Sequence, residues 1–177
     1  LSVGDIELSE GKFMRTQLDF VEPDSAATEQ AVARLKEAGC GAIVAAQGFS
    51  VDDPSGEKSV MEQARAAGVP ACGTHEMSGL YGLRVRARTA VLNASILPKM
   101  IETAEMTHKA LAANSDTPLM VMRSDGGVMS LEEVRRRPVM TLLSGPAAGV
   151  AAALMFLKAS DALFLEVGGT STDICLV

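Results

Sequence analysis

Helix-like and strand-like patterns alternate between residues 25 and 75, and this alternation limits the choice of fold more than any other feature of the sequence. An amphipathic pattern over residues 26–38 predicts a helix, and the apolar run Gly41–Gln47 after it predicts a buried strand. The same pair repeats, with a helix predicted over Glu57–Ala67 and a strand over Val69–His75. Strands that are joined through a helix lie parallel, so the sequence predicts an α/β unit.

The flanking segments add a hairpin and a long helix. A glycine-containing connection separates the apolar segments Val3–Leu8 and Phe13–Leu18, which predicts two antiparallel strands. From Arg86 to Asn114 the pattern is helical for nearly the whole stretch. Pro98 removes one backbone donor from this helix, so we expect the helix to kink or to split after Ile96.

Turn and cap signals organise the last third of the chain. Thr117–Ser124 is predicted to be a strand and Asp125–Gly127 a tight turn. The S-x-x-E pattern of Ser130 and Glu133 predicts the start of a short helix that runs to Arg136. The segment Pro138–Lys158 is predicted to begin as a strand and to continue as a helix with a proline in its first turn.

Composition excludes several classes of function. The chain has 16 basic and 22 acidic residues, a formal net charge of −6, which disfavours nucleic acids and anionic membranes as partners. No apolar run approaches the roughly 18 residues of a membrane-spanning helix. The three cysteines (Cys40, Cys72 and Cys175) are far apart, which predicts reduced, buried thiols in a cytoplasmic protein. Because the chain begins at Leu1 without a methionine, we expect a fragment of a longer protein.

The glycine-rich segment near the C-terminal end carries the strongest chemical signal. Two glycines and three hydroxyl residues form a turn between two apolar runs, and such a turn can surround phosphate oxygens with backbone and hydroxyl donors. The residues are Gly168, Gly169, Thr170, Ser171 and Thr172. Glu166 and Asp173 flank the turn and would repel a bare phosphate, but they suit Mg²⁺, which binds to one or two carboxylates and nucleotide phosphates. A Gly-Gly hairpin with solvated threonines is the alternative.

Several other segments have both a functional and an ordinary interpretation. The helix that begins near Gly145 has a start suited to an anion, or its small residues serve close packing. Asp125–Gly127 is a ligand loop or a hairpin turn, and Asp52 with Asp53 is a metal site or a solvated turn. Of the two histidines, His75 follows a predicted strand and is either a cleft residue or a structural one, and His108 is expected to be scaffold.

Three motifs in a fixed order resemble those of a known family. They are MRSDGGVMS, RPVMTLLSGPAAGV and EVGGTSTDI, and RTAVLNASILP lies upstream of them. Together they are similar to the hydantoinase A and 5-oxoprolinase family, and the likeness runs from the loop after residue 48 to Val177. This family contains ATP-dependent hydrolases of N-methylhydantoin and 5-oxoproline and related acetone and acetophenone carboxylase subunits.

The resemblance implies the fold of the sugar kinases, heat-shock chaperones and actin. In that fold two ribonuclease-H-like α/β lobes, each with a mixed, largely parallel sheet flanked by helices, enclose ATP and Mg²⁺. Residues 1–137 would be the remainder of the first lobe. Residues 138–177 would be the helix that connects the lobes and the truncated start of the second lobe.

The resemblance also implies roles for single residues. Nucleotide contacts fall on Gly168–Thr172 and Gly145, and the acids near the metal are Glu166 and Asp173. The family usually has Asp at the position of Glu166 and more often has Asn at the position of Asp125. The substrate side falls on Asp125, Gly126, Gly127 and Arg88, and Ser78 and Arg84 lie in the same stretch as Arg88.

The activity implied is ATP-driven opening of a cyclic amide such as a hydantoin or 5-oxoproline. Phosphorylation of the amide oxygen would make the carbonyl carbon reactive toward water. A hydantoinase B-like second subunit and the remainder of the parent chain are the implied partners, and the 177-residue chain by itself is expected to be inactive. Three alternatives stay open: a ketone carboxylase subunit, a nucleotide-binding module without amide chemistry, and a plain α/β domain whose glycine-rich turns are only turns.

Overall fold

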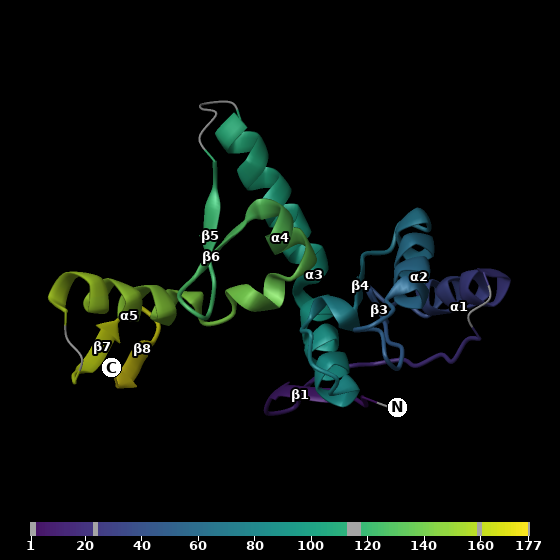
Figure 1. The fold of residues 1–177 in the computed structure, drawn as a ribbon, viewed down its shortest axis with the longest axis horizontal. Coiled ribbons are helices and arrows are strands. Elements are labelled where there is room, and N and C mark those ends of the chain that lie inside the picture. Colours follow the sequence, from purple (N-terminus) through teal and green to yellow (C-terminus); the bar gives the residue numbers. More distant parts are fainter. Residues whose placement is uncertain (1–2, 23–24, 113–117, 159–160, 177) are drawn as a thin grey trace. The chain divides into compact units, whose positions relative to one another are not determined.

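The chain forms two compact units. A computed structural model describes residues 3–22, 25–112, 118–158 and 161–176, and the contacts divide these into residues 1–102 and residues 103–177. The division predicted between residues 137 and 138 is a boundary between two lobes of a larger fold, not a boundary between compact units of this chain. It stays a prediction. Each unit is described by itself below (Figure 1).

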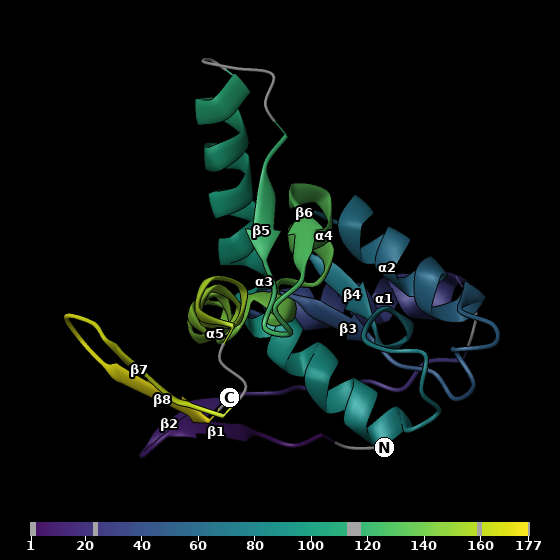
Figure 2. The ribbon, with the colours of Figure 1, turned by 60° about the vertical axis from the view of Figure 1, so that its left-hand side comes forward.

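The first unit is built on a pair of parallel strands. Strands β3 (Ile43–Ala45) and β4 (Ala71–Gly73) pair in parallel, and helix α2 (Ser55–Ala66) connects them. Helix α1 (Ser25–Glu37) packs against α2, and Figure 2 shows both helices beside the two strands. A small apolar core holds these elements together, and its buried members are Val32, Ile43, Ala45, Met61, Ala64, Val69 and Ala71. The predicted α/β unit is therefore confirmed here.

Glycines end both of these helices, as the sequence predicts. Gly39 and Gly68 have φ angles of +83° and +78°, a left-handed conformation that costs glycine little and other residues more. The strands are shorter than predicted. Residues Thr74–Glu76 form a 3₁₀ turn (η1) instead of the end of β4, so His75 lies in this turn.

The N-terminal hairpin lies in the first unit, and the long helix begins in the first unit and ends within the residues of the second. Strands β1 (Ile6–Ser9) and β2 (Lys12–Met14) pair antiparallel. Helix α3 (Leu83–Ala112) continues through Pro98 without a break, so of the two predicted outcomes, a kink or a split, the split does not occur. Proline removes only one hydrogen bond, and the buried side chains of Ala94 and Leu97 hold the turn before it. Asn114, the predicted end, lies outside the described residues.

The second unit contains a hairpin and a short capped helix. Strands β5 (Met120–Met122) and β6 (Val128–Ser130) pair antiparallel, and the predicted turn between them has Gly126 at a φ of +81°. Ser130 caps helix α4 (Leu131–Arg136), since its hydroxyl accepts a hydrogen bond from the backbone N–H of Glu133 at 3.3 Å. The start and the end of this helix are both as predicted.

One predicted strand in this unit is wrong. Residues Pro138–Thr141 form a 3₁₀ helix (η2), although their apolar, β-branched composition favours a strand. Proline at the first position cannot donate to a strand ladder but suits the first turn of a helix. The Thr141 hydroxyl donates to the Pro138 carbonyl at 2.8 Å and closes the turn.

The unit ends in a helix and a hairpin. Helix α5 (Ser144–Leu157) has Pro146 in its first turn, as predicted, and lies beside the hairpin of β7 (Leu163–Val167) and β8 (Thr172–Leu176) (Figures 1 and 2). One face of this hairpin is apolar and exposed, and it consists of Leu163, Leu165, Val167, Ile174 and Leu176. The other face carries Phe164, Glu166, Asp173 and Cys175 in opposed pairs.

The sheets are smaller and more antiparallel than the expected mixed, largely parallel sheet. The described residues form four two-stranded sheets, and only β3 and β4 are parallel. The other pairs are antiparallel neighbours in sequence, and short connections favour such hairpins. Along the described chain no helix has the length and apolar character needed to cross a membrane.

The cysteines are free thiols, as predicted. Cys72 is buried in β4 and its thiol donates to the backbone carbonyl of Ala90 at 3.5 Å. Burial is the main cause that raises the pKa of Cys72 to about 12, so this thiol is inert at neutral pH. Cys40 and Cys175 are only half-buried.

Candidate functional site

The turn between β7 and β8 exposes free backbone donors. The Gly168 N–H donates to the Ser171 carbonyl at 2.9 Å and closes the turn. Along the described chain, the N–H groups of Gly169, Thr170 and Ser171 make no hydrogen bond, and the whole turn is exposed. Three donors at one exposed turn fit the oxygens of a phosphate group.

Two carboxylates lie opposite each other, one residue pair away from this turn. Glu166 and Asp173 are paired residues of the antiparallel ladder, and like charges in this arrangement destabilise a hairpin. Neither carboxylate has a cationic or hydrogen-bonding partner within the described residues. A divalent cation held by both and by a nucleotide phosphate would remove the repulsion, so the pair fits Mg²⁺. The described residues contain no group of three or more metal-ligating side chains.

A glycine of α5 makes room for this pair. A Cβ atom at Gly149 would lie 2.7 Å from Glu166 Oε2 and 2.7 Å from Phe164 Cζ, which is closer than atoms pack. Gly149 of this helix therefore serves close packing against β7. Gly145 lies at the start of the same helix, where it is exposed and borders open space, and no side chain caps this helix end.

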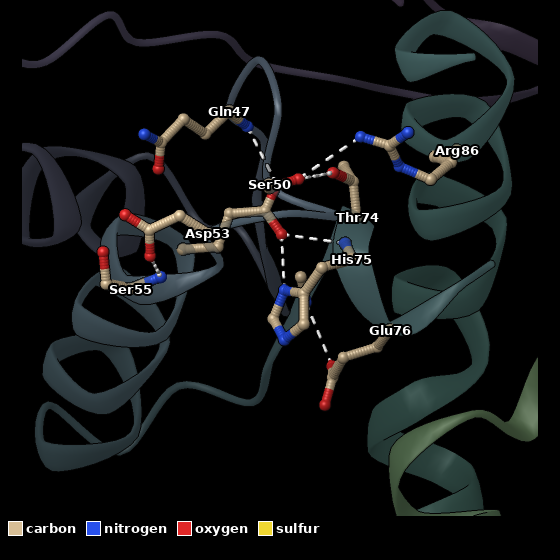
Figure 3. Close-up of polar contacts among 10 residues, drawn as sticks. Gln47, Ser50, Asp53, Ser55, Thr74, His75, Glu76 and Arg86 are labelled. Atoms are coloured by element: carbon tan, nitrogen blue, oxygen red, sulfur yellow. Dashed lines mark hydrogen bonds and ion pairs between the residues drawn. The ribbon is translucent and has the colours of Figure 1, made fainter. Parts of the chain in front are cut away.

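A second polar cluster lies in the first unit, at the carboxyl ends of β3 and β4 (Figure 3). Its centre is Glu57 in the first turn of α2, whose side chain is 1% exposed. Glu57 accepts hydrogen bonds from the Thr74 hydroxyl at 2.5 Å, from the backbone N–H groups of Gln47 at 2.8 Å and His75 at 2.9 Å, and contacts His75 Nδ1 at 2.6 Å. Ligands of open α/β sheets bind at this edge.

A buried arginine connects this cluster to α3. Arg86 is 2% exposed. Its guanidinium donates to the Ser50 hydroxyl at 3.3 Å and to the carbonyl of Leu80, and Ser50 also contacts the Thr74 hydroxyl at 3.3 Å. The loops after β3 and before α3 are therefore tied to the same buried network.

The family of the chain follows from its sequence profile. The description of the matching family is hydantoinase/oxoprolinase, and the match covers residues 86–177, just over half of the chain. The chain belongs to the hydantoinase/oxoprolinase family. The matched residues include α5, the β7–β8 hairpin and its turn.

Proteins similar to the chain are much longer than it is. The caprolactamase subunit alpha of Pseudomonas jessenii is 30% identical, over 94% of this chain and 25% of that protein. The solved structure of an ATP-dependent caprolactamase from Pseudomonas jessenii matches 98% of this chain and 25% of its own, with 27% identity and a TM-score of 0.67. The chain thus spans about a quarter of the length of these relatives.

A second solved structure supports the fold alone. The nucleotide-free structure of an acetone carboxylase matches 86% of this chain and 22% of its own, with 21% identity and a TM-score of 0.69. The chain therefore shares the α/β arrangement of its described residues with two longer ATP-dependent enzymes.

The aspartates that the sequence singles out make hydrogen bonds and ion pairs with other residues of the chain. Asp125 accepts from the Gly127 N–H at 3.0 Å and pairs with Arg123, and the hydrogen bond from Gly127 is the main cause that lowers its pKa. Such contacts are those of a hairpin turn. Asp52 accepts from the Tyr81 hydroxyl at 2.8 Å and Asp53 from the Ser55 N–H at 3.0 Å, so neither faces a metal site made of other described residues.

Arg84, Arg88 and Ser78, from the stretch predicted to face the substrate, take no part in these contacts. Arg84 and Arg88 are exposed on α3 and make no hydrogen bond or ion pair with any described residue. Ser78 accepts a hydrogen bond from the Leu80 N–H at 3.4 Å. His108 is also exposed on α3. The substrate roles of these residues stay predictions.

Sequence reasoning missed Glu57 and Arg86, although helical spacing contains a signal for both. Glu57 shares a stripe of α2 with the buried Met61 and Ala64, at spacings of four and three residues. Arg86 begins a similar stripe on α3 that continues with Ala90, Asn93 and Leu97, all buried. A charged residue within a buried stripe must be paired or hydrogen-bonded, and this mismatch distinguishes Arg86 from its exposed neighbours.

Acid should weaken the first unit through Glu57. Burial raises the pKa of this carboxyl, but the donors from Thr74, His75 and Gln47 outweigh burial and hold the pKa below the ordinary range. A carboxylate with a lowered pKa in the folded state adds stability above its unfolded pKa, about 4.3, and this stability is lost as the pH falls through the folded pKa. We expect the free energy of unfolding, from urea titrations, to fall more steeply in acid for the wild type than for Glu57→Gln. Parallel curves would contradict this assignment.

Proposed function

We propose that the chain is part of an ATP-dependent enzyme that opens a cyclic amide by activating the amide carbonyl with a phosphoryl group. The β7–β8 turn carries this proposal, because its free backbone donors lie next to two carboxylates without counter-charges. An ordinary solvated hairpin gains nothing from two opposed acids. Membership of the hydantoinase/oxoprolinase family and the similarity to a caprolactamase subunit support the same conclusion.

We propose that the nucleotide phosphates contact the N–H groups of Gly169, Thr170 and Ser171, with the hydroxyls of Thr170–Thr172 beside them. Glu166 and Asp173 would hold Mg²⁺, directly or through water. The bound nucleotide supplies a phosphoryl group that converts the amide oxygen into a leaving group. The chain's own contribution is to position the phosphates and to place negative charge where the cation is needed.

The wider architecture is part of the proposal. A complete cleft of the actin type would need a second lobe and a second phosphate loop, and the chain spans only a quarter of its relatives. We propose that those parts belong to the same longer protein. A second subunit is proposed as a partner because the similar protein of Pseudomonas jessenii is named a subunit alpha.

The proposal is tested by phosphate release from the full-length protein with its partner subunit. ATP and Mg²⁺ are supplied alone and then with 5-oxoproline, a hydantoin, caprolactam or acetone with bicarbonate. Release stimulated by a cyclic amide, with formation of the ring-opened acid, is the expected result. Stimulation by acetone alone would replace the hydrolase with a carboxylase, and nucleotide binding without stimulation would indicate a module without amide chemistry.

A further inference from the structure

The outer edge of β3, on the side away from β4, carries backbone groups without partners. The Ile43 N–H donates to the Pro70 carbonyl at 2.9 Å, toward β4. The hydrogen-bonding groups of successive residues in a strand point to opposite sides, so the N–H and carbonyl of Val44 point away from β4. Within the described residues, the backbone groups of Ala42, Val44 and Ala46 make no hydrogen bond. Such an edge is a template for another strand.

Helices already cover both faces of the β3–β4 pair. Ile43 and Ala45 belong to the core that α1 and α2 share. On the opposite face, Cys72 lies beside Val44 in register and contacts the Ala90 carbonyl of α3. Parallel sheets with both faces covered are typical of α/β proteins, and their sheets have more than two strands. The direction in which this sheet can grow is therefore along its edges.

The outer edge of β4 differs from the outer edge of β3. At β4, the Ala71 carbonyl accepts a hydrogen bond from the Arg65 guanidinium at 3.0 Å, and the Gly73 N–H donates to the Glu76 carboxylate at 3.1 Å. Side chains that occupy these groups block pairing with another strand. No side chain of the described residues does the same for β3. The contrast indicates that β4 ends the sheet and that β3 does not.

A cavity of about 600 Å³ lies along the open edge, and all the residues that line it belong to the first unit. Gly41–Val44 form one wall, and Ala87, Val91 and Ala94 of α3 form another. The segment Thr16–Phe20 lines it as well. A strand residue takes up about 3.3 Å along the strand, 4.8 Å between strands and 10 Å between layers, roughly 160 Å³. The cavity therefore has room for about four residues of one strand.

The charged residues that line the cavity are already paired. Asp5 lies 3.0 Å from Arg15, and Asp19 lies 2.8 Å from Arg34. The wall that α3 contributes is small and apolar. An ionic ligand would thus find no free counter-charge among the described lining residues, and its burial would be costly. Backbone donors and acceptors beside apolar walls suit an apolar strand instead.

We propose that an apolar strand of about four residues fills this cavity and pairs with β3 through Val44. The strand comes from a part of the longer protein outside residues 1–177, since the chain spans about a quarter of the length of its relatives. This inference rests on the part of the proposed function that places the chain in a longer protein, and not on the amide chemistry. A strand from the same polypeptide covers the edge as the protein folds, which removes the hazard of an open edge.

Hydrogen exchange of the full-length protein, resolved to single residues by mass spectrometry with gas-phase fragmentation, tests the pairing. The Val44 amide should exchange as slowly as the Ile43 amide, because both would be donors within one sheet. Ile43 is the matched control, since its amide is paired with the Pro70 carbonyl in the same strand. Exchange about 100-fold or more faster at Val44 than at Ile43 would show an open edge and overturn the proposal.

Photo-cross-linking identifies the occupant. A diazirine side chain at position 14, where Met14 lines the cavity, should cross-link to an apolar segment of the same polypeptide outside residues 1–177. The same side chain in place of Met106, which is 64% exposed on α3, should not reach that segment. A mixture of ¹⁴N- and ¹⁵N-labelled protein separates links within one polypeptide from links between copies.

Cross-links from position 14 to the partner subunit, to a second copy, or to residues 1–177 alone would overturn the assigned occupant. Both measurements are made without ATP or an amide. A negative result here therefore leaves the proposed ring opening standing, and a failure of ring opening leaves this strand pairing standing.

Discussion

Glu57→Ala is expected to lower the free energy of unfolding of the chain by about 3–5 kcal/mol, because several buried donors lose the one carboxylate that accepts from all of them. The reason lies in the groups left behind. The Thr74 hydroxyl, the N–H groups of Gln47 and His75, and His75 Nδ1 all lose their acceptor. Each buried donor without a partner costs about 1–3 kcal/mol, although water entering the space vacated by the side chain would reduce the sum.

Chemical denaturation of Glu57→Ala, with Glu62→Ala as the control, measures this effect. Glu62 lies on the same helix but is exposed, so its replacement should change stability by no more than about 0.5 kcal/mol. Equal stability of the two variants would show that Glu57 is not held as described.

Asp173→Asn is expected to weaken Mg²⁺-dependent nucleotide binding by the full-length protein by about 100-fold or more. Loss of an outer-shell partner of a metal ligand already costs roughly 10- to 100-fold in affinity, and Asp173 is proposed to lie closer to the ion. The same change should leave the hairpin intact, because it removes the repulsion between Asp173 and Glu166 on the opposite strand. A gain of about 0.2–1 kcal/mol in stability is expected without nucleotide.

Asp173→Asn should lower the affinity for Mg-ATP but raise the stability, and these opposite changes make the experiment specific. Calorimetric titration with Mg-ATP gives the affinity, and thermal unfolding without nucleotide gives the stability. Asp161→Asn is the matched control, because Asp161 is an exposed acid that precedes β7. Unchanged Mg-ATP affinity in Asp173→Asn would remove the metal role, and loss of both affinity and stability would indicate a damaged fold instead.

The sequence predicts local structure well where the signal is local. The glycine stops after α1 and α2, the Ser130 cap and the β7–β8 hairpin all depend on residues within one or two turns of each other, and all are present. The apolar residues of Pro138–Thr141 predict a strand, but a proline that cannot donate outweighs their preference. The extent of the sheets depends on pairing between distant segments, which periodicity alone does not specify.

The two candidate sites differ in how much the sequence reveals. Glycines, hydroxyls and acids lie next to each other at the β7–β8 turn, so their chemistry can be inferred from adjacent letters. The cluster around Glu57 draws Ser50, Thr74 and Arg86 from three separate segments. Apart from His75, for which the sequence leaves a cleft role open, its members are predicted only as ordinary helix, strand and loop residues, because only the folded chain brings their polar atoms together.

The alternation of side chains along β7 and β8 has a consequence for how this segment can evolve. Glu166 and Asp173 occupy the face that also bears Phe164 and Cys175, and the next residue on either strand belongs to the exposed apolar face. A single inserted or deleted residue in a strand, without a compensating bulge, would exchange the two faces. Gaps in this stretch should therefore be far rarer among homologues than changes of residue type, and a relative with an indel here should be examined for loss of nucleotide chemistry.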